Sequence, residues 1–298
     1  MDRKMIKGYI FSILSAVIYG CMPLMAKFIY ADGVNSISLV FLRNFLALPV
    51  LAALALTQQK TLKVTPKALP SIIVIALFGC ALTPILLFSS YNYIASGTAT
   101  ILHYVYPAMV VIGGVLFFKK KVPVGNIVSV ILCVAGIALF YDPTQPLDLT
   151  GCALALGSGI TFAAYVLLLS NFRYKEVTGF TFSFYIAAAS AVITFIACIA
   201  SGSLVLPATL TGWLLCTLFA VMITCGAVIL FQQGAFIIGG EKTSILSTLE
   251  PITSIIVGVL VFHETLKIND IFGSVLVVLA SILIAVFDMV KKEKITAE

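Results

Sequence analysis

Glu250 and Pro251 stand side by side in an apolar stretch, 245–262, that is long enough to lie in lipid. An ionisable side chain near the centre of a transmembrane helix costs about 2.5–3.5 kcal/mol on insertion scales. A proline inside a helix frees the carbonyl group four residues earlier, here that of Ser247. Both kinds of group are tolerated at membrane depth only where protein or water satisfies them. We therefore expect a helix that is broken near Ser247, with Glu250 facing the bundle interior or a wet cavity.

A second proline, Pro107, lies 144 residues before Pro251, and the sequences around the two prolines are alike. Shifting 101–121 onto 245–265 matches eight identical residues, and His103 and Tyr106 then correspond to Ser247 and Glu250. Positions three apart lie on one face of a helix. We expect both prolines to break their helices, and these four side chains to form the core of a binding site at matched positions.

The composition shows which solvent surrounds these residues. Of the 298 residues 61% are hydrophobic and 10% are charged, and the mean hydropathy is +1.15. A soluble domain carries about 25% charged residues, so we expect an all-α integral membrane protein. The seven cysteines lie in apolar runs without a CxxC pair and are interpreted as small hydrophobic residues. Ten apolar runs of helical length are expected to span the membrane: 7–29, 36–57, 69–89, 94–118, 124–141, 150–170, 178–200, 209–232, 242–262 and 269–290.

The charged residues between these runs predict the orientation. Most lysines and arginines fall in loops on one side, including Arg3, Lys63, Arg173 and Lys242, whereas Lys27 and Lys267 fall on the other side. By the positive-inside rule both termini are expected in the cytoplasm of a cell (inner or plasma) membrane. The net charge of +6 is then a consequence of topology, and no nucleic-acid partner is expected.

The shift of 144 residues divides the chain into two five-helix halves, 1–145 and 146–298, within one membrane domain. An odd number of helices inverts the second half relative to the first. The loop 119–121 is three lysines, whereas its counterpart 263–265 is His-Glu-Thr, as expected if the two loops lie on opposite sides. Inverted repeats with a site at the midplane are typical of secondary transporters. The alternative is a chance similarity between two apolar helices.

Further polar residues inside the expected spans are candidates for the same site. Each candidate also has a structural interpretation. Arg43 could reach outward to the membrane surface or pair with Glu250, and the tyrosines could be interfacial anchors. His103 could be a hydrogen-bonded core residue, Glu250 could cap backbone amides, and one glutamine could meet cytoplasmic water. The additional candidates are Arg43, Tyr19, Tyr91, Tyr165, Gln232 and Gln233.

Enzymatic signatures are missing from the sequence. The two histidines are far apart, no HExxH or GxSxG occurs, and 239–244 (GGEKTS) lacks the spacing of a phosphate-binding loop. We therefore expect no enzyme, no cofactor, no metal and no ATP. An ion gradient, facilitated diffusion or exchange would have to drive transport.

The stretches LEPITSIIVGVLVFHETL and IFGSVLVVLASILIAVF resemble the last two helices of EamA-like proteins of the drug/metabolite transporter superfamily. Glu250, Pro251, Glu264 and Gly273 occupy the positions of that family's pattern, and FLRNFLA with Arg43 resembles its second helix. His263 stands where the family often has glycine. The resemblance covers essentially the whole chain and implies a ten-helix inverted-repeat transporter, whose members mostly export amino acids or other small metabolites.

These observations together predict a secondary transporter that exports amino acids or related compounds by alternating access. A carboxylate, an imidazole and tyrosines suit a zwitterion or a cation, and Glu250 is also a candidate carrier of a coupling proton. One alternative is an exporter of organic cations or drugs with Glu250 as counter-ion. An alternative of another class is a membrane structural subunit that transports nothing. The expected partners are a small-molecule substrate and the lipid bilayer.

Overall fold

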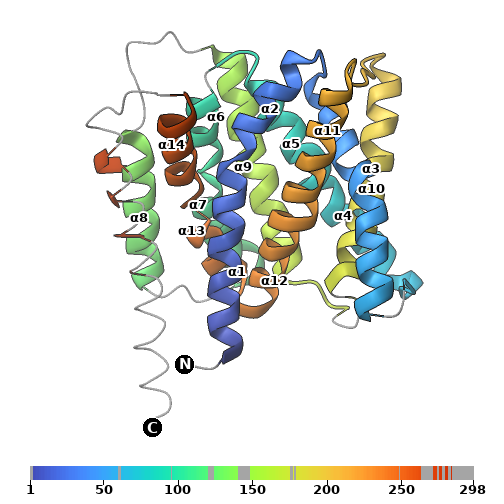
Figure 1. Cartoon of the computed structure of the whole chain (residues 1–298). Coiled ribbons are helices and arrows are strands. Elements are labelled where there is room, and N and C mark those ends of the chain that lie inside the picture. Colours follow the sequence, from blue (N-terminus) through green and yellow to red (C-terminus); the bar gives the residue numbers. More distant parts are fainter. Residues whose placement is uncertain are drawn as a thin grey trace.

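A computed structural model describes most of the chain. The described residues are 3–59, 62–94, 96–119, 124–139, 148–174, 177, 179–247, 249–262, 271–273, 275–276, 279–280 and 283. Over these residues the regular structure is entirely helical, in agreement with the expected all-α class. Figure 1 shows the helices side by side, running mostly between the same two ends of the molecule.

The first half of the chain contains eight α-helices and three short helical segments of other types. They are α1 (Arg3–Gly20), α2 (Met22–Ala31), α3 (Ser36–Leu54), the π-helical η1 (Ala55–Gln59), the 3-10 helix η2 (Pro66–Ala68), α4 (Leu69–Ala76), the π-helical η3 (Leu77–Leu82), α5 (Thr83–Ser90), α6 (Ser96–His103), α7 (Tyr106–Phe118) and α8 (Val124–Leu139).

The second half repeats much of this order. Its elements are α9 (Leu149–Ser170), α10 (Gly179–Ala200), α11 (Leu210–Phe219), the π-helical η4 (Ala220–Ala227), α12 (Val228–Ile238), α13 (Gly240–Leu246) and α14 (Leu249–Phe262). Of the expected tenth span, 269–290, the structure describes only scattered helical residues. The loop 263–265 and Lys267 lie outside the described residues.

Six continuous helical stretches are long and apolar enough to cross a membrane, and two shorter apolar helices accompany them. The six cover Arg3–Ala31, Ser36–Gln58, Pro66–Ser90, Leu149–Ser170, Gly179–Ala200 and Leu210–Ile238. The shorter two are Tyr106–Phe118 and Ile127–Gly136. The expected number of ten therefore stays a prediction. The span expected to end at 232 continues to Ile238, which places Gln232 inside the helix and not at its end.

Two spans are interrupted at corresponding places. α6 ends at His103 and α7 begins at Tyr106, whereas α13 ends at Leu246 and α14 begins at Leu249. Pro107 and Pro251 each lie in the first turn of the second helix of their pair. A proline is tolerated in a first turn because its missing amide hydrogen would have no intrahelical partner there. The π-helical segments η3 and η4 also occupy positions that the shift of 144 residues brings together.

Helix caps gather at one end of the bundle. Asn35, Asp148 and Thr209 accept hydrogen bonds from the first backbone amides of α3, α9 and α11, so that each of these helices has a polar start. At the same end Asp32 accepts from the amide and the hydroxyl of Thr209. This contact joins the α2–α3 turn to the loop before α11.

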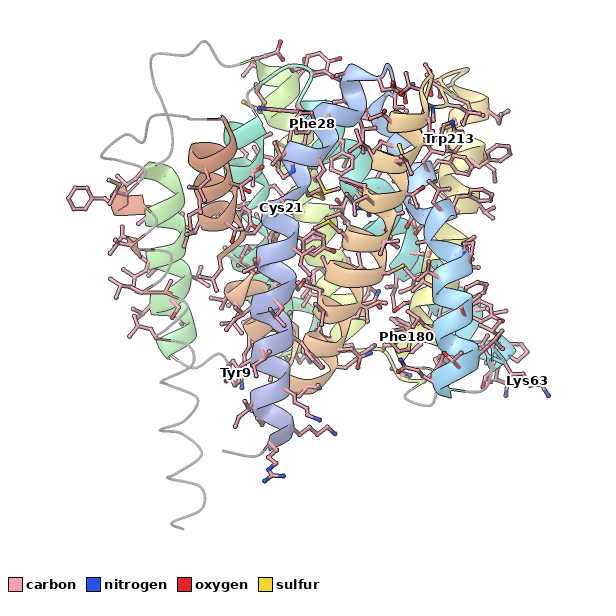
Figure 2. The ribbon with its side chains drawn as sticks, viewed as in Figure 1. Tyr9, Cys21, Phe28, Lys63, Phe180 and Trp213 are labelled. Carbon is pink, nitrogen blue, oxygen red and sulfur yellow. The ribbon has the colours of Figure 1, made fainter. Side chains whose placement is uncertain are left out.

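Figure 2 shows Phe28 and Trp213 near this capped end, and Tyr9, Lys63 and Phe180 toward the opposite end. Large apolar side chains remain exposed on the sides of the helices, such as Leu116 at 68%, Leu214 at 63% and Ile196 at 60%. Exposed apolar surface of this kind is suited to lipid, not water. The fold is therefore that of a multi-pass membrane protein.

The interior holds three clusters of buried apolar residues. Tyr19 of α1 packs against two of them, one around Tyr165 and Phe231 and the other around Phe88 and Phe219. Tyr19 itself keeps part of its surface accessible. A tyrosine between two packed clusters places a hydroxyl inside the bundle, within electrostatic range of Arg43 and Glu250.

Candidate functional site

The two helix breaks are joined by hydrogen bonds. The hydroxyl of Tyr104 donates to the carbonyl oxygen of Ser247 at 3.1 Å, and the hydroxyl of Tyr106 donates to that of Ser244 at 3.3 Å. The sequence predicts that Pro251 frees the Ser247 carbonyl and that protein or water must satisfy it; in the structure Tyr104 and the amide of Glu250 both bond to this carbonyl. The last carbonyl groups of a helix have no intrahelical partner. The tyrosines of one break therefore satisfy the end of α13 in the other.

Glu250 lies in the first turn of α14 and is 6% exposed. The start of a helix carries a partial positive charge, so a carboxylate is favourable there. The Tyr104 hydroxyl lies within hydrogen-bond reach of the Glu250 carboxyl group as well. One phenol proton cannot serve the carboxylate and the Ser247 carbonyl at once. Glu250 is therefore only partly satisfied by this tyrosine.

His103 is held as a core residue. Its Nδ1 lies 2.8 Å from the Oγ of Ser158, and its ring is tilted against Tyr106 and Phe162 at 5.2 and 5.4 Å between centroids. Its carbonyl oxygen approaches α9 so closely that a Cβ atom at Gly159 would lie 2.6 Å from it. These contacts favour the structural interpretation of His103, which lines the break and fixes its distance from α9.

Arg43 of α3 is buried, with 3% of its surface exposed. Its Nη2 lies 3.5 Å from the carbonyl oxygen of Cys80 in η3, and its guanidinium carbon lies 6.0 Å from the centre of the Phe88 ring. Nε meets no hydrogen-bond partner among the described residues, and no described carboxylate forms an ion pair with Arg43. Two interpretations are therefore wrong: Arg43 does not reach outward, and it does not pair with Glu250.

Tyr165 and Gln232 lie beside each other in the same region. The Tyr165 hydroxyl lies next to the Gln232 amide group and within electrostatic range of Arg43. Gln232 is fully buried, and its Oε1 accepts a hydrogen bond from Ser183 Oγ at 2.7 Å. Its Nε2 makes no hydrogen bond with any residue that the structure describes. Of the two glutamines, one of which was expected to meet cytoplasmic water, Gln232 is therefore excluded.

Tyr19 and Tyr91 complete the group that the structure brings together. Tyr19 lies within electrostatic range of both Arg43 and Glu250. Tyr91 lies beside Thr100 and within electrostatic range of Glu250. Gln233, the next residue of α12, is only half-buried, and no described contact joins it to this group. Tyr106 and Ser247 belong to the junction of the two breaks.

Sequence reasoning missed Tyr104, Thr100 and Ser158. On a straight helix Tyr104 would lie about 100° around the axis from His103, outside the face that His103 and Tyr106 share. The break after His103 changes the direction of the chain and turns Tyr104 toward Ser247. The nearby Pro107 was the sequence signal that could have identified Tyr104, because residues on the two sides of a helix break do not have to share one continuous face.

The described geometry defines a helical membrane protein with a central polar region. One buried cation, Arg43, and one buried carboxyl group, Glu250, lie around Tyr19 without forming an ion pair. This arrangement is typical of a protein that accepts a small polar molecule within the bilayer. The model of the EamA-like transporter family matches this chain twice, over residues 6–141 and 149–286. The chain therefore belongs to the EamA-like transporter family and is a membrane transporter.

Two of the relatives that this chain resembles match it over nearly the whole length. An "Uncharacterized transporter" of Clostridium kluyveri is 21% identical over 291 residues, which cover 93% of this chain and 92% of the relative. The "Uncharacterized inner membrane transporter YicL" of Salmonella typhimurium is 23% identical over 302 residues, covering 94% and 95%. A solved structure described as "Crystal structure of protein" aligns with a TM-score of 0.78 at 15% identity, over 94% of this chain and 96% of that one. This likeness shows the fold alone.

Proposed function

We propose that this transporter exports amino acids or closely related zwitterionic metabolites by alternating access. The observation that carries the proposal is the pair of opposite charges, Arg43 and Glu250, that are both buried but not joined to each other. A buried charge without a partner is strongly destabilising. A bound zwitterion would place its carboxylate near Arg43 and its ammonium group near Glu250, so that each buried charge gains an opposite charge.

The broken helices support the transport mechanism. In inverted-repeat transporters the site lies between discontinuous helices near the midplane, and the halves rock around it. Here α6–α7 and α13–α14 are discontinuous, and hydrogen bonds from Tyr104 and Tyr106 link them. We propose that the halves 1–145 and 146–298 are inverted repeats of five helices each, with both termini in the cytoplasm. The distribution of basic loops supports this orientation.

A gradient or an exchange reaction would drive the cycle, with no ATP. Glu250 is the residue suited to carry a coupling proton, because its carboxyl group is buried and shares Tyr104 with the Ser247 carbonyl. A facilitative mechanism is the alternative. Uptake measured with and without a pH gradient distinguishes the two.

An exporter of organic cations is the second candidate. It is favoured by the three tyrosines near Glu250, namely Tyr19, Tyr91 and Tyr104, since aromatic faces attract cations. Arg43 weighs against it, because a cationic substrate would bring a second positive charge toward a buried guanidinium group.

The test is transport of a radiolabelled panel into proteoliposomes that contain the purified protein. The panel holds neutral amino acids, and quaternary ammonium cations as the competing class. Transport of amino acids with preference over the cations supports the proposal. Transport of the cations alone supports the second candidate. If nothing moves and Glu250→Gln changes only the melting temperature, a structural subunit is the better description.

A further inference from the structure

Two buried hydrogen-bond donors near Tyr165 have no acceptor within 3.5 Å among the residues that the structure describes. One is Nε of Arg43, on α3, and the other is Nε2 of Gln232, on α12. The Tyr165 hydroxyl lies next to the Gln232 amide and within electrostatic range of Arg43. Exposure is 3% for Arg43 and 0% for Gln232. Bulk water therefore does not supply the missing acceptors.

One other polar atom of each side chain has a hydrogen-bond partner that helps to fix its position. Oε1 of Gln232 accepts from Ser183 Oγ at 2.7 Å. Nη2 of Arg43 faces the carbonyl oxygen of Cys80, which also accepts from Nδ2 of Asn44 at 3.2 Å. A buried donor without an acceptor destabilises the fold. Two such donors, one next to the Tyr165 hydroxyl and the other within electrostatic range of it, indicate a site that is completed by a ligand.

We propose that Arg43 Nε and Gln232 Nε2 form the subsite for the carboxylate group of the substrate. A carboxylate has two oxygens in one plane and only accepts hydrogen bonds, so it fits two separate N–H donors and a guanidinium charge. This subsite rests on the proposed function and deepens it, because it orients the zwitterion. The carboxylate lies toward α3 and α12, and the ammonium group lies toward Glu250 at the start of α14.

Gln232 thereby becomes a determinant of specificity. Its amide is uncharged, so it selects for a carboxylate through a single hydrogen bond while Arg43 supplies the attraction. Asn44 is the neighbouring amide but is not part of the subsite, because its Nδ2 is already used by the carbonyl oxygens of Val40 and Cys80. A site built to donate to a substrate group rejects analogues that lack the group, since its own donors then stay unpaired.

The test uses two sets of three matched probes, each with an amino acid, its decarboxylated amine and its deaminated acid. They are L-leucine, 3-methylbutylamine and 4-methylpentanoate, and L-phenylalanine, phenethylamine and 3-phenylpropionate. Transport of each labelled probe is measured in proteoliposomes for the unmodified protein, Gln232→Met, Gln232→Glu and Arg43→Lys. The control is Gln58→Met, the same substitution at an exposed position.

We expect Gln232→Met to raise the KM for the amino acid about tenfold and to leave the amine unchanged. Tenfold corresponds to about 1.4 kcal/mol, close to the lower end of the range of about 1.5–3 kcal/mol for one hydrogen bond to a charged group. Gln232→Glu keeps the size of the side chain and the acceptor for Ser183 but loses the donor, so it should weaken amino acids further and favour the amines. Gln232→Glu also tests the subsite if Gln232→Met does not fold. Arg43→Lys keeps the charge without Nε and should raise the KM for both carboxylate-bearing probes.

Three results decide the outcome. Discrimination between carboxylate and amine that falls in the Gln232 variants but not in Gln58→Met supports the subsite. If the unmodified protein transports the amino acids and the Gln232 variants affect all probes equally or not at all, the subsite is wrong and the proposed function stands. If the unmodified protein neither transports nor is thermally stabilised by any of the six probes, the proposed function is wrong and the subsite falls with it.

Discussion

The hydroxyl of Tyr104 donates a hydrogen bond to the carbonyl oxygen of Ser247 at 3.1 Å, across 143 residues of sequence. This bond ties the break between α6 and α7 to the break between α13 and α14. Neither break is therefore an isolated defect in its helix. Any movement that separates the two broken helices has to exchange this bond for another one, and the neighbouring Glu250 carboxyl group is within reach of the same hydroxyl.

The first prediction concerns this bond. Tyr104→Phe removes the hydroxyl but keeps the ring, and it leaves the Ser247 carbonyl with the amide of Glu250 alone. We expect a loss of about 0.5–1.5 kcal/mol in stability, the net contribution of one hydrogen bond, because the carbonyl keeps its second partner. Thermal unfolding of the purified protein in detergent measures this loss. Tyr93→Phe is the control, because Tyr93 is 52% exposed; equal melting temperatures for both variants would contradict the prediction.

The second prediction separates the roles of Glu250. Glu250→Gln keeps the size of the side chain and removes the charge that would face a substrate ammonium group. A hydrogen bond to a charged group contributes about 1.5–3 kcal/mol, so the KM for a transported amino acid should rise about 10- to 100-fold. Transport kinetics in proteoliposomes give the value. An unchanged KM with a lower melting temperature would show instead that Glu250 serves only the start of α14.

A Gln variant also tests proton coupling. If Glu250 carries the proton, Glu250→Gln should abolish the stimulation of transport by a pH gradient while exchange of labelled for unlabelled substrate continues. If the gradient still accelerates transport in this variant, another group carries the proton.

The third prediction uses two glycines of α9. A Cβ atom at Gly159 would lie 2.6 Å from the carbonyl oxygen of His103, whereas one at Gly157 would have an ordinary contact at 3.7 Å with Leu86. The backbone of a neighbouring helix gives way less easily than the end of a side chain. Gly159→Ala should therefore destabilise the protein by about 1–3 kcal/mol, as overpacking does, and Gly157→Ala should be nearly neutral. Melting temperatures of the two variants provide the comparison, and a tolerated Gly159→Ala would argue against close packing at the break.

The fourth prediction is a pH dependence at the capped end of the bundle. Asp32 accepts from the Thr209 hydroxyl at 2.6 Å and from the amides of Thr209 and Ala208. The Thr209 hydroxyl, followed by these amides, lowers the pKa of Asp32 below its ordinary value of 3.8. Because the pKa in the folded state is depressed, this stabilisation is present above pH 3.8 and is lost as the pH falls through the lower pKa of the folded state.

Asp32→Asn should therefore lower the melting temperature at neutral pH, with a difference from the unmodified protein that shrinks as the pH falls below 3.8. Thr209→Val removes the hydroxyl that donates to Asp32 and also the cap of α11, and because the first contact is shared, the double variant should lose less than the sum of the two. Additive losses at neutral pH would mean that Asp32 and Thr209 act independently.

Part of the site could be predicted from the sequence because its signals are local. Pro107 and Pro251 remove backbone hydrogen bonds wherever the helix lies. Arg43, Glu250 and Gln232 stand out because polar groups are costly in an apolar stretch. The partners of these residues were not predictable in this way. The interpretation of Gln232 as the end of a span failed because its helix continues for six more residues to Ile238, and residues 233–238 carry no strong stop signal.

The sequence by itself determined that this protein is a helical membrane transporter of the EamA-like family, and it marked the polar positions inside the spans. Hydropathy and family motifs act along the chain, so one sequence is enough to read them. Only the tertiary structure decided that Tyr104 reaches Ser247, that Arg43 and Glu250 form no ion pair with each other, and that Gln232 lies buried beside Tyr165. The physical reason is that each of these relationships depends on how separate helices pack against each other and on how a helix break reorients the residues next to the break. The spacing of residues within one helix encodes neither the packing nor the reorientation.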